Sequence, residues 1–230
     1  MTKRRQGFTL VEIAIVLVII GLLLGGILKG QEMITQAKIK NVIADFSGVS
    51  AAYHGYQDRY RAIPGDDPNA ATRWASMTNP APVAGDGNGI VAGTYNNAGA
   101  TCTTAVEACS WWDHLRKAGF VSGNGAQQPF NALTGHIGVQ TGDGVSPTPG
   151  PTLLNVAGGN GFVGLIICSA NLPDKIASAV DTQMDDGTAS QGTVRGLLQG
   201  APNPNVGAGQ VATPSYAETG TNVYVLCRAF

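Results

Sequence analysis

The chain has 230 residues, of which 43% are hydrophobic and only 13% are charged, and its formal net charge is -1 at pH 7. This length is enough for one membrane anchor and one exposed domain, and the near-neutral charge gives no indication of a nucleic-acid partner. The charge is unevenly distributed, because Lys3, Arg4 and Arg5 precede the first apolar segment and the rest of the chain is mildly acidic.

Residues 8–28 form an apolar segment whose only charged residue is Glu12. A helix of about 20 apolar residues spans the hydrocarbon core of a bilayer. A cleaved secretory signal would have a shorter apolar core and a small-x-small cleavage site, and no Ala-x-Ala sequence follows here. We therefore expect a transmembrane helix that remains in the mature protein. Basic residues flank both ends of the segment, so the positive-inside rule does not decide its orientation.

Glycines in this region are spaced for close contact between helices. Gly21 and Gly25 form one small-xxx-small pair, and Gly26 and Gly30 form another. In lipid, such pairs allow two helix backbones to approach each other closely. We treat these four glycines as candidate helix-packing positions.

Residues 29–63 are expected to continue the same helix as an exposed amphipathic half. Apolar residues recur at intervals of three and four, which is typical of one helix face. They are Ile39, Val42, Phe46, Val49, Tyr53, Tyr56 and Tyr60. Pro64 and Gly65 end the helix, since a proline disfavours helical geometry in the residue before it. The stripe predicts that this half packs against a globular head formed by residues 64–230.

The head is rich in Gly, Ala, Asn, Thr and Pro, which predicts loops and short strands over residues 64–100 and 122–160. Helices are expected at 105–120, capped by Gly119, and at 172–187, with Pro173 in the first turn and Gly187 as the stop. Of Trp111 and Trp112, one is expected in the core and the other exposed. Apolar runs predict strands at 161–171 and 222–230. These elements predict an α+β fold in which a small antiparallel sheet packs beside the long helix.

All four cysteines lie beyond residue 100, at Cys102, Cys109, Cys168 and Cys227. An even number in an exported domain indicates disulfides in an oxidising compartment, and free buried thiols are the alternative. Cys102 and Cys109 are close in sequence, whereas Cys168 and Cys227 lie in predicted strands. Of the three possible connectivities we therefore favour 102–109 with 168–227.

The carboxylate of Glu12 is a functional candidate, because an ionised group inside a membrane is costly unless it is paired. Residues 8–28 contain no Lys, Arg or His. If the chain is cut after Gly7, Phe8 gains an α-amino group with a pKa of about 8. Another subunit, shifted along the helix axis, could present this amine to Glu12. A head-to-tail contact of this kind does not close on itself and builds a helical filament.

The stretch "RRQGFTLVEIAIVLVIIGLLL" resembles the N-terminal signal of type IV prepilins and type II secretion pseudopilins. That signal is a short basic leader ending in Gly, then Phe, then Thr-Leu-hydrophobic-Glu within an apolar helix, and the match covers about residues 3–28. The resemblance implies a pilin-like fold and a leader peptide at residues 1–7. It further implies that a prepilin peptidase cuts between Gly7 and Phe8 and N-methylates Phe8. In the assembled filament, Glu12 would pair with the Phe8 amine of a neighbouring subunit.

The same resemblance implies insertion in the inner membrane, with the leader in the cytoplasm and the head in the periplasm. The expected partners are the prepilin peptidase, other pilin or pseudopilin subunits and the assembly platform machinery. Many major pilins carry a proline near the end of the membrane segment, where this chain has Lys29. At 230 residues the chain is also larger than typical major subunits. Two questions therefore stay open: whether the filament is a pilus or a pseudopilus, and whether this chain is a major or a minor subunit.

Other chemistry is less evident in the sequence. Asp86 and Asn88 of "GDGNG" could ligate calcium, although Ile90 stands where an EF-hand loop has an oxygen ligand, and plain turns are the alternative. No catalytic constellation is evident, so an enzyme is not expected. The alternative to a filament subunit is a single-pass membrane-anchored periplasmic binding domain that does not polymerise.

Overall fold

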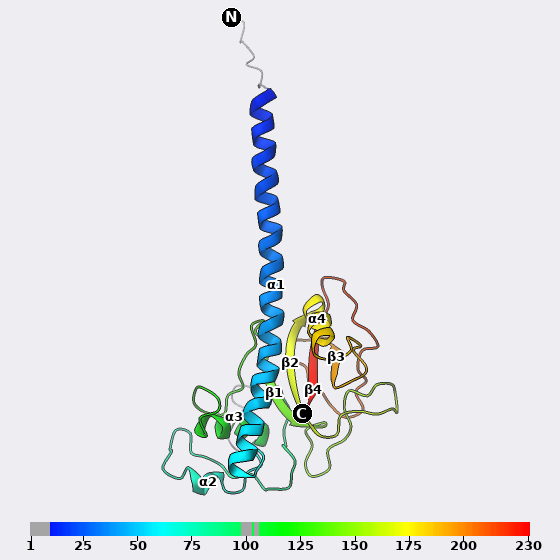
Figure 1. Ribbon diagram of the computed structural model, residues 1–230. Helices are drawn as coiled ribbons and strands as arrows, with labels where there is room; N and C mark the ends of the chain where they lie inside the picture. The colour runs from blue at the N-terminus through cyan, green and yellow to red at the C-terminus, as the bar shows by residue number, and fades with distance from the viewer. Residues whose placement is uncertain (1–9, 98–102, 104–105) are drawn as a thin grey trace, which may run out of the picture. The chain divides into compact units, whose positions relative to one another are not determined.

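A computed structural model describes residues 10–97, 103 and 106–230 (Figure 1). Its elements in chain order are α1 (Leu10–Tyr60), α2 (Ala70–Arg73), α3 (Glu107–Lys117), β1 (Ile137–Thr141), β2 (Leu165–Pro173), α4 (Asp174–Met184), β3 (Val194–Leu198) and β4 (Val223–Ala229). The chain divides into two compact units, one ending at Lys38 and the other comprising Ile39–Phe230. The expected α+β fold, with a long N-terminal helix and an antiparallel sheet, is confirmed.

The apolar stripe of α1 is buried from Ile39 onward, as its spacing predicts. Ile39, Val42, Phe46, Val49, Tyr53 and Tyr56 are buried, and Tyr60 is partly buried against the same core. The helix ends at Tyr60, and Arg61 adopts a positive φ of 54° shortly before Pro64. Gly55 packs closely against the ring of Phe120, since a Cβ at this position would lie 2.8 Å from it and the ring would have to shift.

The sheet has the strand order β1-β2-β4-β3, and every neighbouring pair is antiparallel. Strands β2 and β4 at its centre correspond to the two apolar runs that the sequence predicts as strands. The edge strands β1 and β3 are each five residues long. β1 lies within residues 122–160, where loops and short strands are expected, whereas no strand is expected at β3. Backbone hydrogen bonds pair β1 with β2 and β3 with β4. These two edge strands therefore depend on tertiary contacts and not on local sequence.

Alternate residues of the central strands enter two separate cores, since successive side chains of a strand point to opposite faces. Ile167 and Leu226 belong to the larger core, which also contains the buried faces of α1, α3 and α4. Cys168 and Val225 point to the opposite face and join a second core. In Figure 1, the later part of α1 and the helix α3 are seen beside the sheet. Tyr53 of α1 contacts the C-terminal residue Phe230, with ring centroids 4.5 Å apart.

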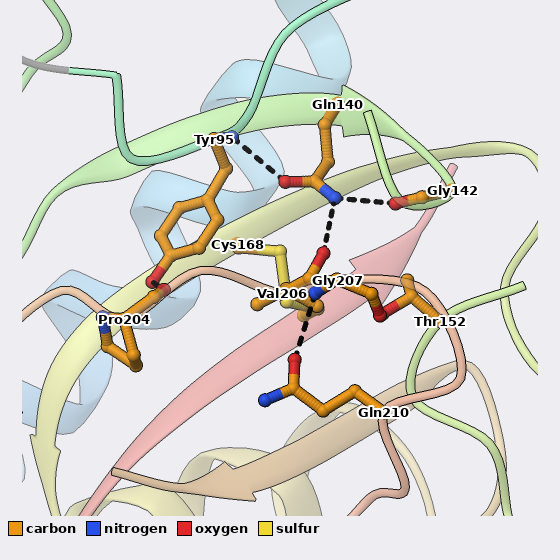
Figure 2. The surroundings of a disulfide bond; sticks show 10 residues. Tyr95, Gln140, Gly142, Thr152, Cys168, Pro204, Val206, Gly207 and Gln210 are labelled. Atoms are coloured by element: carbon orange, nitrogen blue, oxygen red, sulfur yellow. Dashed lines mark hydrogen bonds between the residues drawn. A yellow bond between two sulfur atoms is a disulfide. The ribbon is translucent and has the colours of Figure 1, made fainter. Parts of the chain in front are cut away.

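A disulfide joins the central strands, between Cys168 of β2 and Cys227 of β4 (Figure 2). The two residues are direct partners in the strand register, which confirms this half of the expected connectivity. Cys109 is disulfide-bonded as well. Its expected partner, Cys102, lies outside the described residues, so the 102–109 pairing stays a prediction.

Loops over the second core are organised by the buried side chain of Gln140 in β1 (Figure 2). Its Oε1 accepts a hydrogen bond from the backbone N–H of Tyr95 at 2.9 Å, and its Nε2 donates to the carbonyls of Gly142 and Val206. The hydroxyl of Tyr95 donates to the carbonyl of Pro204 at 2.6 Å. One amide side chain thus pairs with backbone groups of three loops. These backbone groups would be costly to leave without hydrogen bonds when they are buried.

Two local expectations are wrong. Pro173 does not lie in the first turn of a helix; it ends β2 and stands at the N-cap of α4, because its extended backbone is paired with Val223 of β4. Trp111 and Trp112 are both buried, instead of one being exposed. The reason is that every residue from Ala108 to Leu115 of α3 is buried, so this part of the helix has no solvent-facing side.

Candidate functional site

The first half of α1 is an apolar helical surface without a protein core around it. Every residue from Leu10 to Lys29 is exposed, so no part of this apolar segment is buried within the described chain. Within the described part of the chain, α1 is the one helix long and apolar enough to cross a membrane, by length and composition. Because a bilayer is the solvent that such a surface requires, the segment fits a membrane-anchored single-pass protein.

Glu12 lies in the first turn of α1 and is exposed on this apolar surface. The positive end of the helix dipole stabilises a carboxylate there by about 0.3–1 kcal/mol. An ionised carboxylate in a membrane-spanning helix is costly unless it is paired. The ionised form of Glu12 therefore gains from a positive group close to it, in addition to the helix dipole.

The four glycines predicted to pack against another helix all lie on α1. Among the described residues, and apart from the neighbouring backbone of α1 itself, no atom comes within 4 Å of a Cβ placed at Gly21, Gly25, Gly26 or Gly30. Their backbone is therefore open to contact from a second molecule, which is the property that a small-xxx-small pair needs. Whether a second helix binds there stays a prediction, as do cleavage after Gly7 and methylation of Phe8, which lie outside the described residues.

The calcium candidates Asp86 and Asn88 lie in a loop whose polar groups bond mainly to one another and to backbone. Asp86 accepts from the backbone and side-chain nitrogens of Asn88, and Asn88 in turn accepts from Ile90 N–H. The buried Asp66 accepts from Gly87 and Asn88 through Oδ1 and from Gly89 through Oδ2. These bonds account for the turn geometry of the loop.

A third acid, Glu107 at the start of α3, joins this loop, and the three carboxylates of Asp66, Asp86 and Glu107 approach within 4.8 Å of one another. Glu107 accepts from the backbone N–H groups of Ala92 and Asp86. Burial raises the pKa of both Asp66 and Glu107, whereas the N–H donors oppose this rise. Since backbone N–H donors already engage the buried Asp66 and the half-buried Glu107, the cluster holds the loop against the start of α3.

The comparisons with known proteins bear on the N-terminus. Residues 2–28 match the family model of the prokaryotic N-terminal methylation motif, the signal of type IV prepilins and pseudopilins. No curated protein and no solved structure matches the chain. The motif implies processing by a prepilin peptidase and assembly with other pilin subunits. Together with the long N-terminal helix, it indicates a type IV pilin-like subunit, a structural class that is usually non-enzymatic.

Proposed function

We propose that this chain is a pilin-like structural subunit that a prepilin peptidase cuts between Gly7 and Phe8 and N-methylates on Phe8. The match at residues 2–28 carries this proposal, because it contains residues 2–7 of the leader, the expected cleavage position and the apolar segment. The helix α1 supports it, since the segment that follows the leader is helical from its first described residue, Leu10. The mature protein then polymerises through α1.

The chemistry of assembly follows from the position of Glu12. Cleavage creates an α-amino group on Phe8 with a pKa of about 8, which is positive at neutral pH. Pairing of this amine with Glu12 of a neighbouring subunit neutralises both charges in a medium where each alone is costly. Because the donor and the acceptor lie at different heights on the helix, the contact is head-to-tail and propagates as a helical filament.

The proposed location is the inner membrane before assembly, with the head in the periplasm and the assembly platform as a further partner. The disulfide Cys168–Cys227 supports an exported head, since disulfides persist in oxidising compartments. The filament is a pilus or a secretion pseudopilus, in which this chain is either a bulk or a minor subunit. The N-terminal motif is shared by both kinds of filament.

The first experiment is mass spectrometry of the protein from cells that contain and that lack the prepilin peptidase. The expected N-terminal residue in the first cells is N-methylated Phe8, and in the second the intact leader beginning at Met1. An intact leader in cells with an active peptidase would refute the proposal.

The second experiment replaces Glu12 by Ala and follows membrane insertion and incorporation into filaments separately. We expect insertion to persist and incorporation to be lost, because the apolar segment is unchanged and only the pairing group is removed. Glu32→Gln is the matched control, as Glu32 lies on the same helix and pairs with Lys29 at 2.7 Å. If Glu12→Ala behaves as Glu32→Gln does, the chain is better described as a membrane-anchored binding domain that does not polymerise.

A further inference from the structure

The sequence contains the tripeptide Gly-Asn-Gly at three places, all of them in loops of the head. These are residues 87–89, 123–125 and 159–161. An asparagine followed by glycine can lose its side-chain amide without an enzyme, because glycine has no Cβ to keep its backbone nitrogen away from the asparagine side chain. The three tripeptides are identical, so the structure around each one decides whether this reaction is open to it.

The reaction begins when the backbone nitrogen of the glycine attacks Cγ of the asparagine. A bond forms between these two atoms, the nitrogen releases its proton to solvent, and the side-chain amide takes up a proton and leaves as ammonia. Water then opens the resulting succinimide ring at either carbonyl, which yields aspartate or isoaspartate. The asparagine side chain must therefore be free to move, the glycine nitrogen must not be engaged, and the peptide group between them must be able to turn.

Asn88 does not meet these requirements. Its Nδ2 donates to Asp86 at 2.8 Å, and its Oδ1 accepts from the backbone N–H of Ile90 at 2.7 Å. The N–H of Gly89 donates to Oδ2 of the buried Asp66 at 2.8 Å. The attacking nitrogen and the side chain under attack are thus both held by hydrogen bonds, which would have to break before the ring could form.

Asn160 meets the requirements only in part. The residue is exposed, but its carbonyl accepts from the N–H of Asn155 at 2.9 Å and from Nη1 of Arg195 at 2.8 Å. This carbonyl belongs to the peptide group that has to turn. Gly161 is also closely packed, since a Cβ there would lie 2.6 Å from a side-chain carbon of Leu154. These contacts resist the rotation that brings the glycine nitrogen to Cγ.

Asn124 meets all of the requirements. It is exposed, and among the described residues neither its side chain nor the N–H of Gly125 makes a hydrogen bond. A Cβ at Gly125 would meet only Pro80, at 3.7 Å, which is an ordinary contact. Arg116 anchors the loop on either side by donating to the carbonyls of Ser122 at 3.3 Å and Gly125 at 2.6 Å. The peptide group between Asn124 and Gly125 is not one of those that it holds.

We propose that the folded chain deamidates spontaneously at Asn124, which becomes aspartate or isoaspartate, whereas the fold protects Asn88. The change matters for this loop because Arg116 contacts it on both sides: a Cβ at Gly123 would lie 3.4 Å from Nε, and Nη1 donates to Gly125. Among the described residues Arg116 is in no ion pair. Deamidation adds a negative charge beside this guanidinium, and isoaspartate also lengthens the loop backbone. The inference does not depend on the proposed assembly function.

The test incubates the full chain in detergent at body temperature in a mildly alkaline buffer and follows the three tripeptides by peptide mass spectrometry. Deamidation is detected as the mass gain from replacing NH2 by OH and as separate chromatographic peaks for aspartate and isoaspartate. We expect residue 124 to convert at least about tenfold faster than residue 88, because the hydrogen bonds that hold Asn88 must first break. Residue 160 should convert at a rate between those two.

Two controls separate the effect of the fold from that of the local sequence. In a chain unfolded by urea the three identical tripeptides should convert at similar rates. In folded Asn124→Gln, position 124 should stay unmodified, since the longer side chain forms the corresponding ring slowly, and positions 88 and 160 should behave as in the wild type. The proposal is overturned if residue 124 converts no faster than residue 88 in the folded chain, or if the folded order of rates persists in urea.

Discussion

The hydroxyl of Tyr56 makes a buried hydrogen bond whose removal tests how the long helix is fastened to the head. It donates to Oδ2 of Asp67 at 2.6 Å, and both side chains are 0% exposed. Asp67 also pairs with Arg73 and accepts from the backbone N–H of Asn69 at 2.9 Å. Burial raises the pKa of Asp67, and the Arg73 and Tyr56 bonds outweigh it, so the net effect is a lowered pKa and an ionised carboxylate.

Tyr56→Phe removes this bond, together with the longer one that the hydroxyl accepts from Nη1 of Arg73 at 3.4 Å, and leaves the ring in place. A hydrogen bond to a charged group contributes about 1.5–3 kcal/mol, and we expect the free energy of unfolding to fall by that amount. The measurement is urea unfolding of the full chain in detergent, followed by the fluorescence of Trp74, Trp111 and Trp112, all of which are buried in the same core as Tyr56.

Tyr60→Phe on the same helix is the control, because among the described residues the Tyr60 hydroxyl makes no hydrogen bond, while its ring lies 4.2 Å from the Arg73 guanidinium. It should change stability by less than about 0.5 kcal/mol. In an Asp67→Asn background, Tyr56→Phe should cost less than about 1.5 kcal/mol, since the acceptor is then neutral. The reasoning is refuted if Tyr56→Phe lowers the free energy of unfolding by less than about 0.5 kcal/mol in the wild-type background. It is also refuted if the decrease is the same with Asp67 and with Asn at position 67, because the bond to the charged carboxylate would then contribute nothing extra.

Two further predictions concern the head. A Cβ at Gly138 would lie 1.9 Å from the backbone oxygen of Tyr95, so Gly138→Ala should lower the free energy of unfolding by at least about 2 kcal/mol in the same urea assay. Gly164→Ala is the control, because a Cβ there meets no atom of the described residues within 4 Å, and it should cost under about 0.5 kcal/mol. Equal losses in the two variants would contradict the close approach at Gly138. Burial lowers the pKa of His114 below its usual 6.5, and Nδ1 of the neutral ring accepts a hydrogen bond from the backbone N–H of Gly65. The neutral ring therefore stabilises the fold above about pH 6.5, and this contribution is lost as the pH falls towards the lowered pKa. His114→Gln should flatten the rise in stability with pH below about pH 6.5 by up to about 1.4 kcal/mol per pH unit. The measurement is urea unfolding at a series of pH values between 5.5 and 7.5, and a slope in His114→Gln equal to that of the wild type would exclude the histidine as its source.

The N-terminal segment could be interpreted from local sequence alone. The apolar run, the basic leader and Glu12 together predict a membrane-spanning helix that carries one acid. This prediction depends on the bilayer and on residues close in sequence, so it requires no knowledge of tertiary contacts. The stripe from Ile39 to Tyr56 was equally legible, because burial on one helix face imposes a spacing of three and four residues. The same applies to β2 and β4, whose apolar runs reflect burial on both faces.

The tertiary structure decided the features that join distant segments. Trp111 and Trp112 are both buried because α3 is enclosed along most of its length, a condition that no pattern within α3 reports. Gln140 is buried because three loops need its amide, although glutamine is usually exposed. Pro173 ends β2 because the register with β4 carries the strand up to the first residue of α4.

Three acids at the C-terminal end of α4, Asp181, Asp185 and Asp186, show the same division most clearly. The sequence determined that Asp185 and Asp186 are adjacent, and a helical spacing placed Asp181 beside them. Only the folded chain decided that Asp181 is fully buried and that the hydroxyl of Tyr216 donates to its Oδ2. Burial depends on every segment packed around a group, so neighbouring residues determine which charges meet, and the complete fold determines whether they are satisfied.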